Sequence, residues 1–437
     1  MKKVLIITYY WPPAGGIGVL RCLKFAKYLR NYGWEPMVYT AENAQYPYLD
    51  PDNETDIPPN LTVIKRPILE PFNMFKALTG RKKDAPMSNP LVARDKKPGA
   101  LEKLAVWIRG NFFIPDARAL WIRPSVRFLT RYLKENPVDA LLSDGPPHTN
   151  TMIACKLSQK LGIPWLADFQ DPWTQVDYYQ LFKITPWADR IHKGQEQEVF
   201  QTAHKITIAS PHWKEDLQSI GAKNVEVIFW GYDEDDFKAL KPVGKPKFRI
   251  LHAGILGLDR LPDKVFRALQ RLCNEVPGFK ADLQIDLYGM VDYSIKESIA
   301  IHHLEDCTHY KGTIDRRSVL KETINADLLL LPLNKSANIL GRIPGKLFEY
   351  LRSFVPILCL GPAESDVSQV IQELEAGETF GYDDADGIQH FIYKNYLRFR
   401  EGKENSIPTK DISKYSVAAQ TQKIAHFLNE ITSKTKC

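Results

Sequence analysis

The chain has 437 residues, of which 44% are hydrophobic and 25% are charged, and its formal net charge is +6. This composition is typical of a globular protein and excludes the disordered and fibrous classes. The length exceeds what one hydrophobic core usually covers and therefore predicts two or three domains.

The N-terminal apolar segment is too short to direct secretion. It begins MKKVLIITYY and turns at once into Trp-Pro-Pro, so Val4–Thr8 is predicted to be a first buried strand. No apolar run approaches the roughly 20 residues of a membrane span. The six cysteines are scattered without a close pair, which favours neither a zinc site nor a disulfide framework. We therefore expect a cytoplasmic protein.

Short apolar runs alternate with helical patterns along most of the chain, which is typical of parallel βαβ units. Each run in the first half has the apolar character of a strand covered on both faces. These predicted strands are Val4–Thr8, Pro36–Thr40, Leu61–Lys65, Ala140–Ser143, Pro164–Ala167, Lys205–Ala209 and Val225–Phe229. An amphipathic crossover helix, Val19–Arg30, is predicted between the first two and ends at Gly33. Its basic side carries Arg21, Lys24, Lys27 and Arg30.

A glycine-containing loop, Trp11–Gly18, joins the first strand to this helix. Gly15, Gly16 and Gly18 let backbone amides approach a phosphate or a sugar closely. A dinucleotide site is the alternative, because Glu42 ends the second strand where a ribose-binding acid would lie. Arg21 argues against that alternative, since it stands where the third glycine of the motif belongs.

Positive charge is concentrated in an insertion at about residues 70–135. From Lys76 to Lys134 there are fourteen Lys and Arg residues against four Asp and Glu. Apolar residues at helical spacing are followed by a basic stripe: Leu101, Leu104, Ala105, Ile108 and Phe112, then Arg123, Arg127, Arg131 and Lys134. This combination fits an anionic membrane surface or an anionic substrate. Alternatively, the apolar face packs on its own domain.

Polar segments follow the fourth and fifth predicted strands, at the edge where open α/β sheets bind ligands. His148, in SDGPPHTN, is a candidate for contact with a sugar hydroxyl or the reacting centre; alternatively, it caps the next helix. Asp168 and Asp171, in DFQDPW, are candidate partners of acceptor hydroxyls. The alternative for both is a turn or N-cap role.

An acid-, Pro- and Gly-rich segment, Gly231–Lys247, reads as an interdomain linker. Strands are predicted again at Phe248–His252, Leu283–Tyr288, Leu328–Leu331 and Pro356–Leu360. We expect an N-terminal Rossmann-like domain at 1–232, a linker at 233–246 and a C-terminal Rossmann-like domain at 247–415. A terminal region, 416–437, contains the predicted helix Val417–Leu428, and the sequence leaves open which of the two domains this helix packs on.

The second domain contains the most informative stretch, Asn338–Pro362. Pro344 suits the first turn of a helix, which leaves the following amides, those of Gly345, Lys346 and Leu347, to face a phosphate. Glu349 lies about one turn further and can accept both hydroxyls of a ribose. The alternative is an ordinary surface pair between Lys346 and Glu349, which are three residues apart.

A second loop, Ala253–Arg260, follows a strand and offers Gly254 and Arg260 to a pyrophosphate. The alternative for Arg260 is a surface arginine paired with Asp259 or Asp263. Asp-x-Asp pairs occur at Asp233/Asp235 and Asp384/Asp386, but neither follows an apolar strand, so no metal is expected.

Seven segments together resemble the family 4 glycosyltransferases of the GT-B fold, and the resemblance covers most of the chain. They are PPAGGIG, IPDARALW, GPPHTN, ADFQDPW, VIFWGYDEDDF, AGILGLDR and PGKLFEYL. The resemblance implies two Rossmann-like domains facing a central cleft, a nucleotide-sugar donor held mainly by the second domain, an acceptor held by the first, and transfer with retention of configuration.

The same resemblance assigns roles to particular residues. Glu349 is expected to bind the ribose, while Arg260, Lys346 and the amides after Pro344 stabilise the leaving diphosphate. His148 and Gly16 approach the sugar, and Asp171 approaches the acceptor. The expected partners are a nucleotide sugar and a lipid-linked or growing surface glycan, with peripheral membrane contact at the inner face as a separate hypothesis. Neither a cofactor nor nucleic acid is expected.

The chain departs from the family pattern at two positions. Gly341 stands where a second glutamate usually contacts the donor sugar, and Ile255 stands where an arginine often faces the phosphates. Lys346 or Arg342 is expected to supply the missing positive charge. The alternatives are a nucleotide-sugar epimerase or phosphorylase of the same fold, or a degenerate glycosyltransferase that serves as a binding partner.

Overall fold

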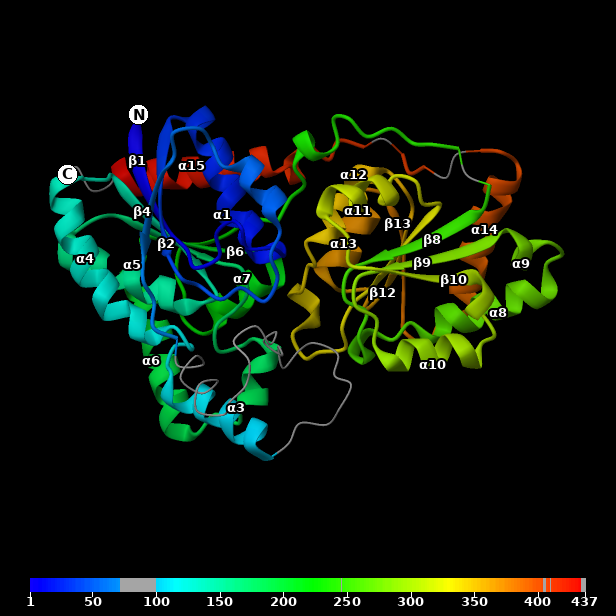
Figure 1. Cartoon of the computed structure of the whole chain (residues 1–437), viewed down its shortest axis with the longest axis horizontal. Coiled ribbons are helices and arrows are strands. Elements are labelled where there is room, and N and C mark those ends of the chain that lie inside the picture. The colour runs from blue at the N-terminus through cyan, green and yellow to red at the C-terminus, as the bar shows by residue number, and fades with distance from the viewer. Residues whose placement is uncertain (71–99, 245, 404–405, 409, 434–437) are drawn as a thin grey trace. The chain divides into compact units, whose positions relative to one another are not determined.

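The computed structural model describes residues 1–70, 100–244, 246–403, 406–408 and 410–433 (Figure 1). These residues form two compact units. The first domain comprises the described residues up to Trp230 together with the chain from Val417 onward, and the second domain comprises Gly231–Ser416. The segments that enter and leave the second domain run side by side, since the Tyr232 amide donates to the Tyr415 carbonyl at 3.1 Å.

The first domain is built on a parallel seven-stranded sheet of order β3-β2-β1-β4-β5-β6-β7. Its strands are β1 (Lys2–Ile7), β2 (Trp34–Ala41), β3 (Thr62–Arg66), β4 (Ala140–Gly145), β5 (Trp165–Phe169), β6 (Lys205–Ile208) and β7 (Val225–Val227). Its α-helices are α1 (Ile17–Tyr28), α3 (Ala100–Phe112), α4 (Ile122–Glu135), α5 (His148–Leu161), α6 (Pro186–Thr202), α7 (Pro211–Ser219) and α15 (Val417–Ser433). Short 3-10 helices are η1 (Leu29–Tyr32), η2 (Pro51–Asp56), η3 (Ala119–Trp121) and η4 (Asp177–Phe182).

Both faces of the first sheet are covered, which explains why its strands are continuous apolar runs. Leu5 and Ile7 belong to a core that includes residues of α4, α5, α6 and α7. Val4 and Ile6 point to the other face, where residues of α1 and α15 complete a second core. The C-terminal helix thus packs within the first domain.

The second domain has a parallel six-stranded sheet of order β10-β9-β8-β11-β12-β13. Its strands are β8 (Phe248–Ala253), β9 (Leu283–Tyr288), β10 (Thr308–Gly312), β11 (Leu328–Pro332), β12 (Ile357–Leu360) and β13 (Gly377–Phe380). Its α-helices are α8 (Asp263–Glu275), α9 (Phe279–Asp282), α10 (Tyr293–Ile301), α11 (Arg316–Thr323), α12 (Lys346–Ser353), α13 (Asp366–Glu373) and α14 (Ala385–Arg400). Short 3-10 helices are η5 (Glu234–Asp236), η6 (Leu258–Arg260), η7 (Glu305–Cys307), η8 (Ile339–Gly341) and η9 (Ser413–Tyr415). Residues of α8, α10 and α14 share one core on this sheet, and Figure 1 shows α11 and α12 on the other side of it.

All eleven predicted strands are confirmed, with ends that differ by at most two residues. The prediction missed β10 and β13, which are the two edge strands of the second sheet. Four of the five residues of β10 are exposed, so its sequence, THYKG, has no apolar run. Edge position therefore removed the signal on which strand prediction depends.

The basic side of α1 does not face solvent. Arg21 and Lys24 are buried, and each has an acidic partner. Arg21 contacts both carboxylate oxygens of Asp168, while Lys24 and Lys27 contact Asp56 at 2.5 and 2.8 Å. The helix thus packs its cations as well as its apolar residues.

Among the helices of the described residues, none is long and apolar enough to cross a membrane. The predicted basic insertion is described only from residue 100 onward, and its earlier part lies outside the described residues.

Candidate functional site

The N-terminus of α12 carries the residues that the sequence assigned to a nucleotide. Gly345 precedes the helix, and Lys346 is its first residue. The Leu347 amide donates to the Pro344 carbonyl at 2.9 Å, so it is already used within the turn. Among the described residues, no acceptor is found for the amides of Gly345 and Lys346. These two amides, rather than all three predicted ones, are placed to bind an anion.

The Glu349 carboxylate is partly buried and held from one side only. Its Oε1 accepts a hydrogen bond from Arg316 Nε at 3.0 Å and forms an ion pair with Arg316 Nη2 at 2.9 Å. Within the described part of the chain, Oε2 accepts none. The partner is therefore Arg316, a residue of α11, and not Lys346 as in the surface-pair alternative. One carboxylate oxygen remains available to a ligand hydroxyl.

Lys346 extends toward the end of β8. A Cβ atom at Gly254 would stand 2.6 Å from the Lys346 Nζ, and Gly254 has φ +117°. Burial, and after it the charge of Arg260, lowers the pKa of Lys346 to about 7, although Glu349 acts in the opposite direction. The ammonium group is thus destabilised in the free protein, and an anion beside it would restore its charge.

His252, next to last in β8, was not predicted to be functional. Its Nδ1 lies 3.0 Å from the Leu330 carbonyl oxygen, and the side chain is buried. Burial, and then the charge of Lys346, holds the pKa of His252 well below its ordinary value. His252 is therefore a neutral group, close enough to Lys346 for that charge to affect it. Its position inside an apolar strand gave no sequence signal.

The two predicted arginines lie at the C-terminal ends of η6 and η8. Arg260 ends η6 and pairs with Asp259, at 3.0 Å between Nη2 and Oδ2. This is one of the surface pairings weighed from the sequence. Arg342 follows η8 and is partly buried. The second domain thus brings Gly254, Lys346 and Glu349 together from β8 and α12, with Arg260 close enough to affect Lys346 electrostatically.

The three glycines of the Trp11–Gly18 loop are placed in different structural surroundings. A Cβ at Gly15 would stand 2.1 Å from Cδ1 of Tyr48, so this glycine is required by packing inside the loop. Gly16 has φ +86° and open space around a Cβ position, so only its backbone conformation requires glycine. Gly18 lies near Gln170, with 3.7 Å between its Cβ position and Oε1.

His148 is the first residue of α5, whose N-cap is Pro147, so the capping alternative is wrong. Its ring stacks on Trp173 with centroids 4.2 Å apart. Burial, and then the charge of His192, lowers the pKa of His148 to about 3. In the described residues its Nδ1 has no hydrogen-bond partner, and neither has the buried Oγ1 of Thr151. A Cβ at Gly145 would stand 2.8 Å from each, so a neutral ring and a hydroxyl lie close to this glycine.

Asp168 is not available to an acceptor. Its Oδ1 accepts from Arg21 at 2.7 Å and from the Thr207 hydroxyl at 2.6 Å, and its Oδ2 accepts from Arg21 at 2.5 Å. The prediction that Asp168 binds a hydroxyl of the sugar acceptor was wrong, because both of its carboxylate oxygens are hydrogen-bonded to the buried Arg21 of α1. Asp171, two residues beyond the end of β5, is partly exposed.

A buried carboxylate that no sequence pattern singled out lies at the end of β4. Asp144 accepts hydrogen bonds from Thr8, Asn150 and Gln170 at 3.1, 2.8 and 3.2 Å. Burial raises the pKa of Asp144 to about 7. Its place at a strand end was the available signal, but a buried strand terminus and a site residue look alike in sequence.

The Asp-x-Asp pairs act as caps and ion-pair partners. Asp233 accepts from the Asp235 amide at 3.1 Å, and Asp384 accepts from the Gly387 amide at 2.9 Å. Asp386 pairs with Arg271 at 2.7 Å.

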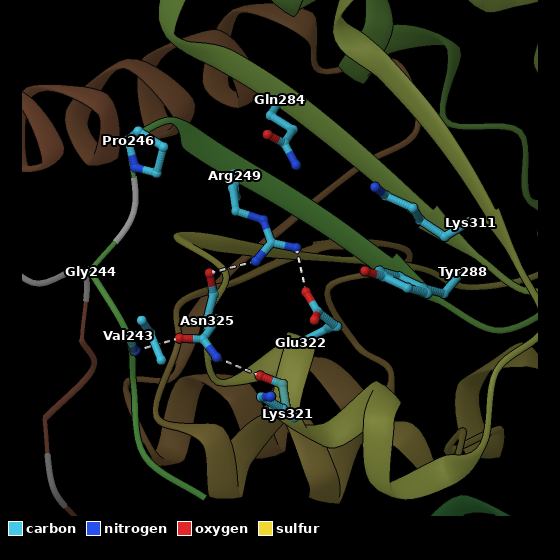
Figure 2. A pocket seen from close by; sticks show the side chains of 10 residues that line it. All are labelled: Val243, Gly244, Pro246, Arg249, Gln284, Tyr288, Lys311, Lys321, Glu322 and Asn325. Carbon is cyan, nitrogen blue, oxygen red and sulfur yellow. Dashed lines mark hydrogen bonds and ion pairs between the residues drawn. The ribbon is translucent and has the colours of Figure 1, made fainter.

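The second domain also contains a cavity of about 430 Å³, which Figure 2 shows from close by. None of the predicted site residues lines it. Its central charge, Arg249, is already paired with Asp286 at 2.6 Å and with Glu322 at 2.8 Å. The Asn325 side chain accepts from the Val243 amide at 2.6 Å, which attaches the linking segment to the cavity wall. The cavity therefore shares no lining residue with the α12 site, and the charge of Arg249 is already paired with acidic side chains of the same domain.

Solved structures similar to this chain combine two such domains. A sucrose-phosphate synthase from Thermosynechococcus elongatus matches with a TM-score of 0.59 at 13% identity, over 99% of this chain and 97% of that one. WaaG, a glycosyltransferase involved in lipopolysaccharide biosynthesis, matches with a TM-score of 0.54 at 14% identity, over 99% and 98%. The chain has the GT-B fold.

The GT-B fold is shared by enzymes of more than one activity. A UDP-N-acetylglucosamine 2-epimerase matches with a TM-score of 0.52 at 14% identity, over 99% of this chain and 97% of that one. Neither a protein-family model nor a curated protein sequence matches the chain. At these identities the structural likeness carries the fold alone.

Proposed function

We propose that this GT-B protein is a glycosyltransferase that moves a sugar from a nucleotide-sugar donor to an acceptor. The observation that carries the proposal is the arrangement at α12. There, the open oxygen of Glu349, two amides and the Lys346 ammonium group belong to one short helix. A carboxylate suits ribose hydroxyls, and the amides with the ammonium suit a diphosphate. The neighbours named for synthase and glycosyltransferase activities support this reading.

Within this function, Lys346 and Arg260 stabilise the charge that grows on the leaving diphosphate. Negative charge beside Lys346 raises its pKa back toward the ordinary value, so the cation forms where it is needed. We place the donor on the second domain without a resident cofactor or metal ion. Gly341 carries no side chain to contact the donor sugar, so sugar choice depends on other groups.

We propose further that transfer proceeds with retention, as the resemblance to family 4 implies. His148, with its stacked neutral ring, and Gly16 approach the sugar, and Asp171 approaches the acceptor hydroxyl. No nucleophile is assigned on the protein. The acceptor hydroxyl therefore attacks the anomeric carbon of the sugar on the same face from which the diphosphate departs, and the diphosphate accepts the proton of that hydroxyl. The acceptor in this proposal is a lipid-linked or growing surface glycan.

Peripheral membrane contact is a separate proposal and rests on α3. Leu104, Ile108 and Phe112 are spaced by four residues and are all exposed, and the Phe112 ring lies 6.4 Å from that of the exposed Trp187. The other side of α3 is packed, since the Asn111 side chain accepts from the Thr185 amide at 2.7 Å. The basic residues of α4 are exposed as well: Arg123, Arg127, Arg131 and Lys134. An apolar ridge with basic residues in the same domain suits the inner face of an anionic membrane.

An epimerase is the second candidate function, because a protein of that name has the same fold. One experiment separates the two. The purified protein is incubated with a panel of nucleotide sugars, with and without glycan and lipid-linked acceptors. Release of nucleoside diphosphate that depends on the acceptor supports transfer, whereas isomerisation of the sugar without acceptor supports the epimerase. Absence of both reactions, with nucleotide sugars that leave the melting temperature unchanged, would instead favour a non-catalytic binding partner.

A further inference from the structure

Glu349 is connected through one arginine to the segment that links the two domains. Arg316, the first residue of α11, donates from Nε to Glu349 and from Nη1 to Asp236 Oδ2 at 2.5 Å, and its Nη2 forms an ion pair with Glu349 Oε1. Asp236 lies in η5, close to the start of the second domain. All three side chains are largely buried, with 22, 17 and 19% exposed for Arg316, Glu349 and Asp236.

The position of Arg316 is unfavourable for a cation unless its contacts hold it there. The N-terminus of a helix carries partial positive charge, which repels an arginine in the first turn. Asp315 offsets part of this effect as the N-cap, accepting from the Ser318 amide at 2.8 Å. Burial lowers the pKa of Arg316, but the charges of Glu349 and Asp236 more than compensate and raise it. The two ion pairs therefore determine where the guanidinium lies.

The geometry of these contacts fixes the direction of the Glu349 carboxylate. A hydrogen bond from Arg316 Nε and an ion-pair contact from Nη2 reach the same oxygen, Oε1, so rotation of the carboxylate is restricted, while Oε2 accepts no hydrogen bond within the described part of the chain. A hydrogen-bonding group that recognises a ligand gains affinity when it is oriented before binding.

We infer that Arg316 is a positioning residue for ribose recognition by Glu349, and that Asp236 anchors it from the linking segment. The inference rests on the proposed binding of a nucleotide at Glu349. It adds a dependence that the site residues alone do not give: affinity for the ribose is controlled by an acid of the segment joining the domains.

A second ion pair supplies a matched control. Arg352, also on α12, contacts Glu234 of the same segment, at 2.5 Å from Nη2 to Oε1 and 2.8 Å from Nε to Oε2. It ties the same helix to the same segment without touching Glu349. Loss of this pair removes a similar tether but leaves the carboxylate oriented.

The test compares R316A, R316K, D236N and R352Q in the full chain. Titration calorimetry measures the Kd of UDP, ADP and GDP and of their 2′-deoxy forms, and turnover gives KM and kcat for the accepted donor. We expect R316A to raise the Kd of the preferred nucleotide and the KM of its sugar about tenfold, the size of one lost charged hydrogen bond. We expect kcat to stay within about twofold, because the change affects ground-state and transition-state binding alike.

The ratio between ribose and deoxyribose binding is the deciding readout. The wild type and R352Q should prefer the ribose form, while R316A should lose most of that preference, R316K should retain part of it, and D236N should fall between. If R316A fails to fold, R316K and D236N still decide the matter. A wild-type ribose preference in folded R316K and D236N, or an equal loss in R352Q, would overturn the inference. If the wild type itself binds no nucleotide, the proposed function fails, and the inference falls with it.

Discussion

Lys346 and Gly254 share a space that allows only one side chain. A Cβ atom at Gly254 would come within 2.6 Å of the Lys346 Nζ, and Gly254 adopts a positive φ that L side chains rarely take. The Lys346 ammonium group thus lies beside the end of β8. This relationship makes Gly254 a testable part of the proposed donor site.

We expect G254A to destabilise the protein and to weaken donor binding. The substitution strains the backbone by about 1–3 kcal/mol, and it also forces Lys346 away from its position. G33A is the matched control, because Gly33 has φ +83° with nothing within 4 Å of a Cβ. It should cost about 1–2 kcal/mol of unfolding free energy and leave nucleotide affinity unchanged. Urea unfolding and nucleotide titration measure the two effects, and equal nucleotide affinity in G254A and wild type would contradict the role of this contact.

The depressed pKa of Lys346 predicts a pH dependence of nucleotide binding. The group has a pKa of about 7 in the free protein, so it is increasingly neutral above pH 7 and must take up a proton when a diphosphate binds. We expect the affinity for nucleoside diphosphate to fall as the pH rises from about 7 to 9. K346M should bind more weakly and lose this slope, which separates Lys346 from titration of the nucleotide itself. Calorimetry in buffers of different ionisation enthalpy should detect the proton uptake.

The same pKa has an opposite consequence for folding. Because the native pKa lies below the unfolded value, the unfolded chain holds more protons between about pH 7 and 10.4. The contribution of Lys346 to stability therefore rises with pH across this window. Urea unfolding at pH 7 and pH 9 gives the free energy of unfolding of wild type and of K346M. The wild-type value should rise relative to the K346M value between these two pH values.

Glu349 was predicted from its place in the chain, but its partner was not. The helix start and the carboxylate one turn inside follow from local sequence. Arg316 lies 33 residues away, and its contact depends on how α11 and α12 pack. Similarly, Arg21 and Asp168 are 147 residues apart, so their pairing was invisible and Asp168 was misassigned. Sequence patterns identify groups at strand ends and helix starts, whereas the charge that each group faces is a property of tertiary packing.

We expect E349Q to lose nucleotide affinity while remaining folded. The neutral amide keeps the shape but weakens the charged hydrogen bonds to a ribose, by about 1.5–3 kcal/mol, which is roughly a tenfold to hundredfold rise in Kd. The variant also leaves Arg316 with Asp236 as its acidic partner, so a modest fall in melting temperature should accompany the loss. Nucleotide titration and acceptor-dependent release of diphosphate check both. Wild-type turnover in E349Q or E349A would remove Glu349 from the site.

His148 is expected to stay neutral through the physiological range. Its native pKa of about 3 lies below the ordinary value near 6.5, so the unfolded state binds the extra proton between these limits. Stability should therefore fall as the pH drops from about 6.5 toward 4, and H148F, which retains a ring to stack on Trp173, should reduce that fall. Urea unfolding at several pH values tests this. An acid limb in the activity profile near pH 6.5 that disappears in H148N would contradict a permanently neutral ring.

The exposed ridge of α3 predicts binding to anionic vesicles. Phe112 and Trp187 are 62% and 60% exposed, and burying an apolar side chain of this size is worth about 1.5–3 kcal/mol. I108E/F112E should therefore sediment with phosphatidylglycerol vesicles at least about tenfold less than wild type. Y293E is the control, because Tyr293 is 74% exposed on α10 of the second domain and outside the ridge.

Replacing Arg123, Arg127 and Arg131 by glutamate should weaken vesicle binding mainly at low salt, since exposed charges are screened as the ionic strength rises. Failure of the wild type to sediment at low salt, or equal sedimentation of I108E/F112E and Y293E, would show that the ridge does not bind membrane.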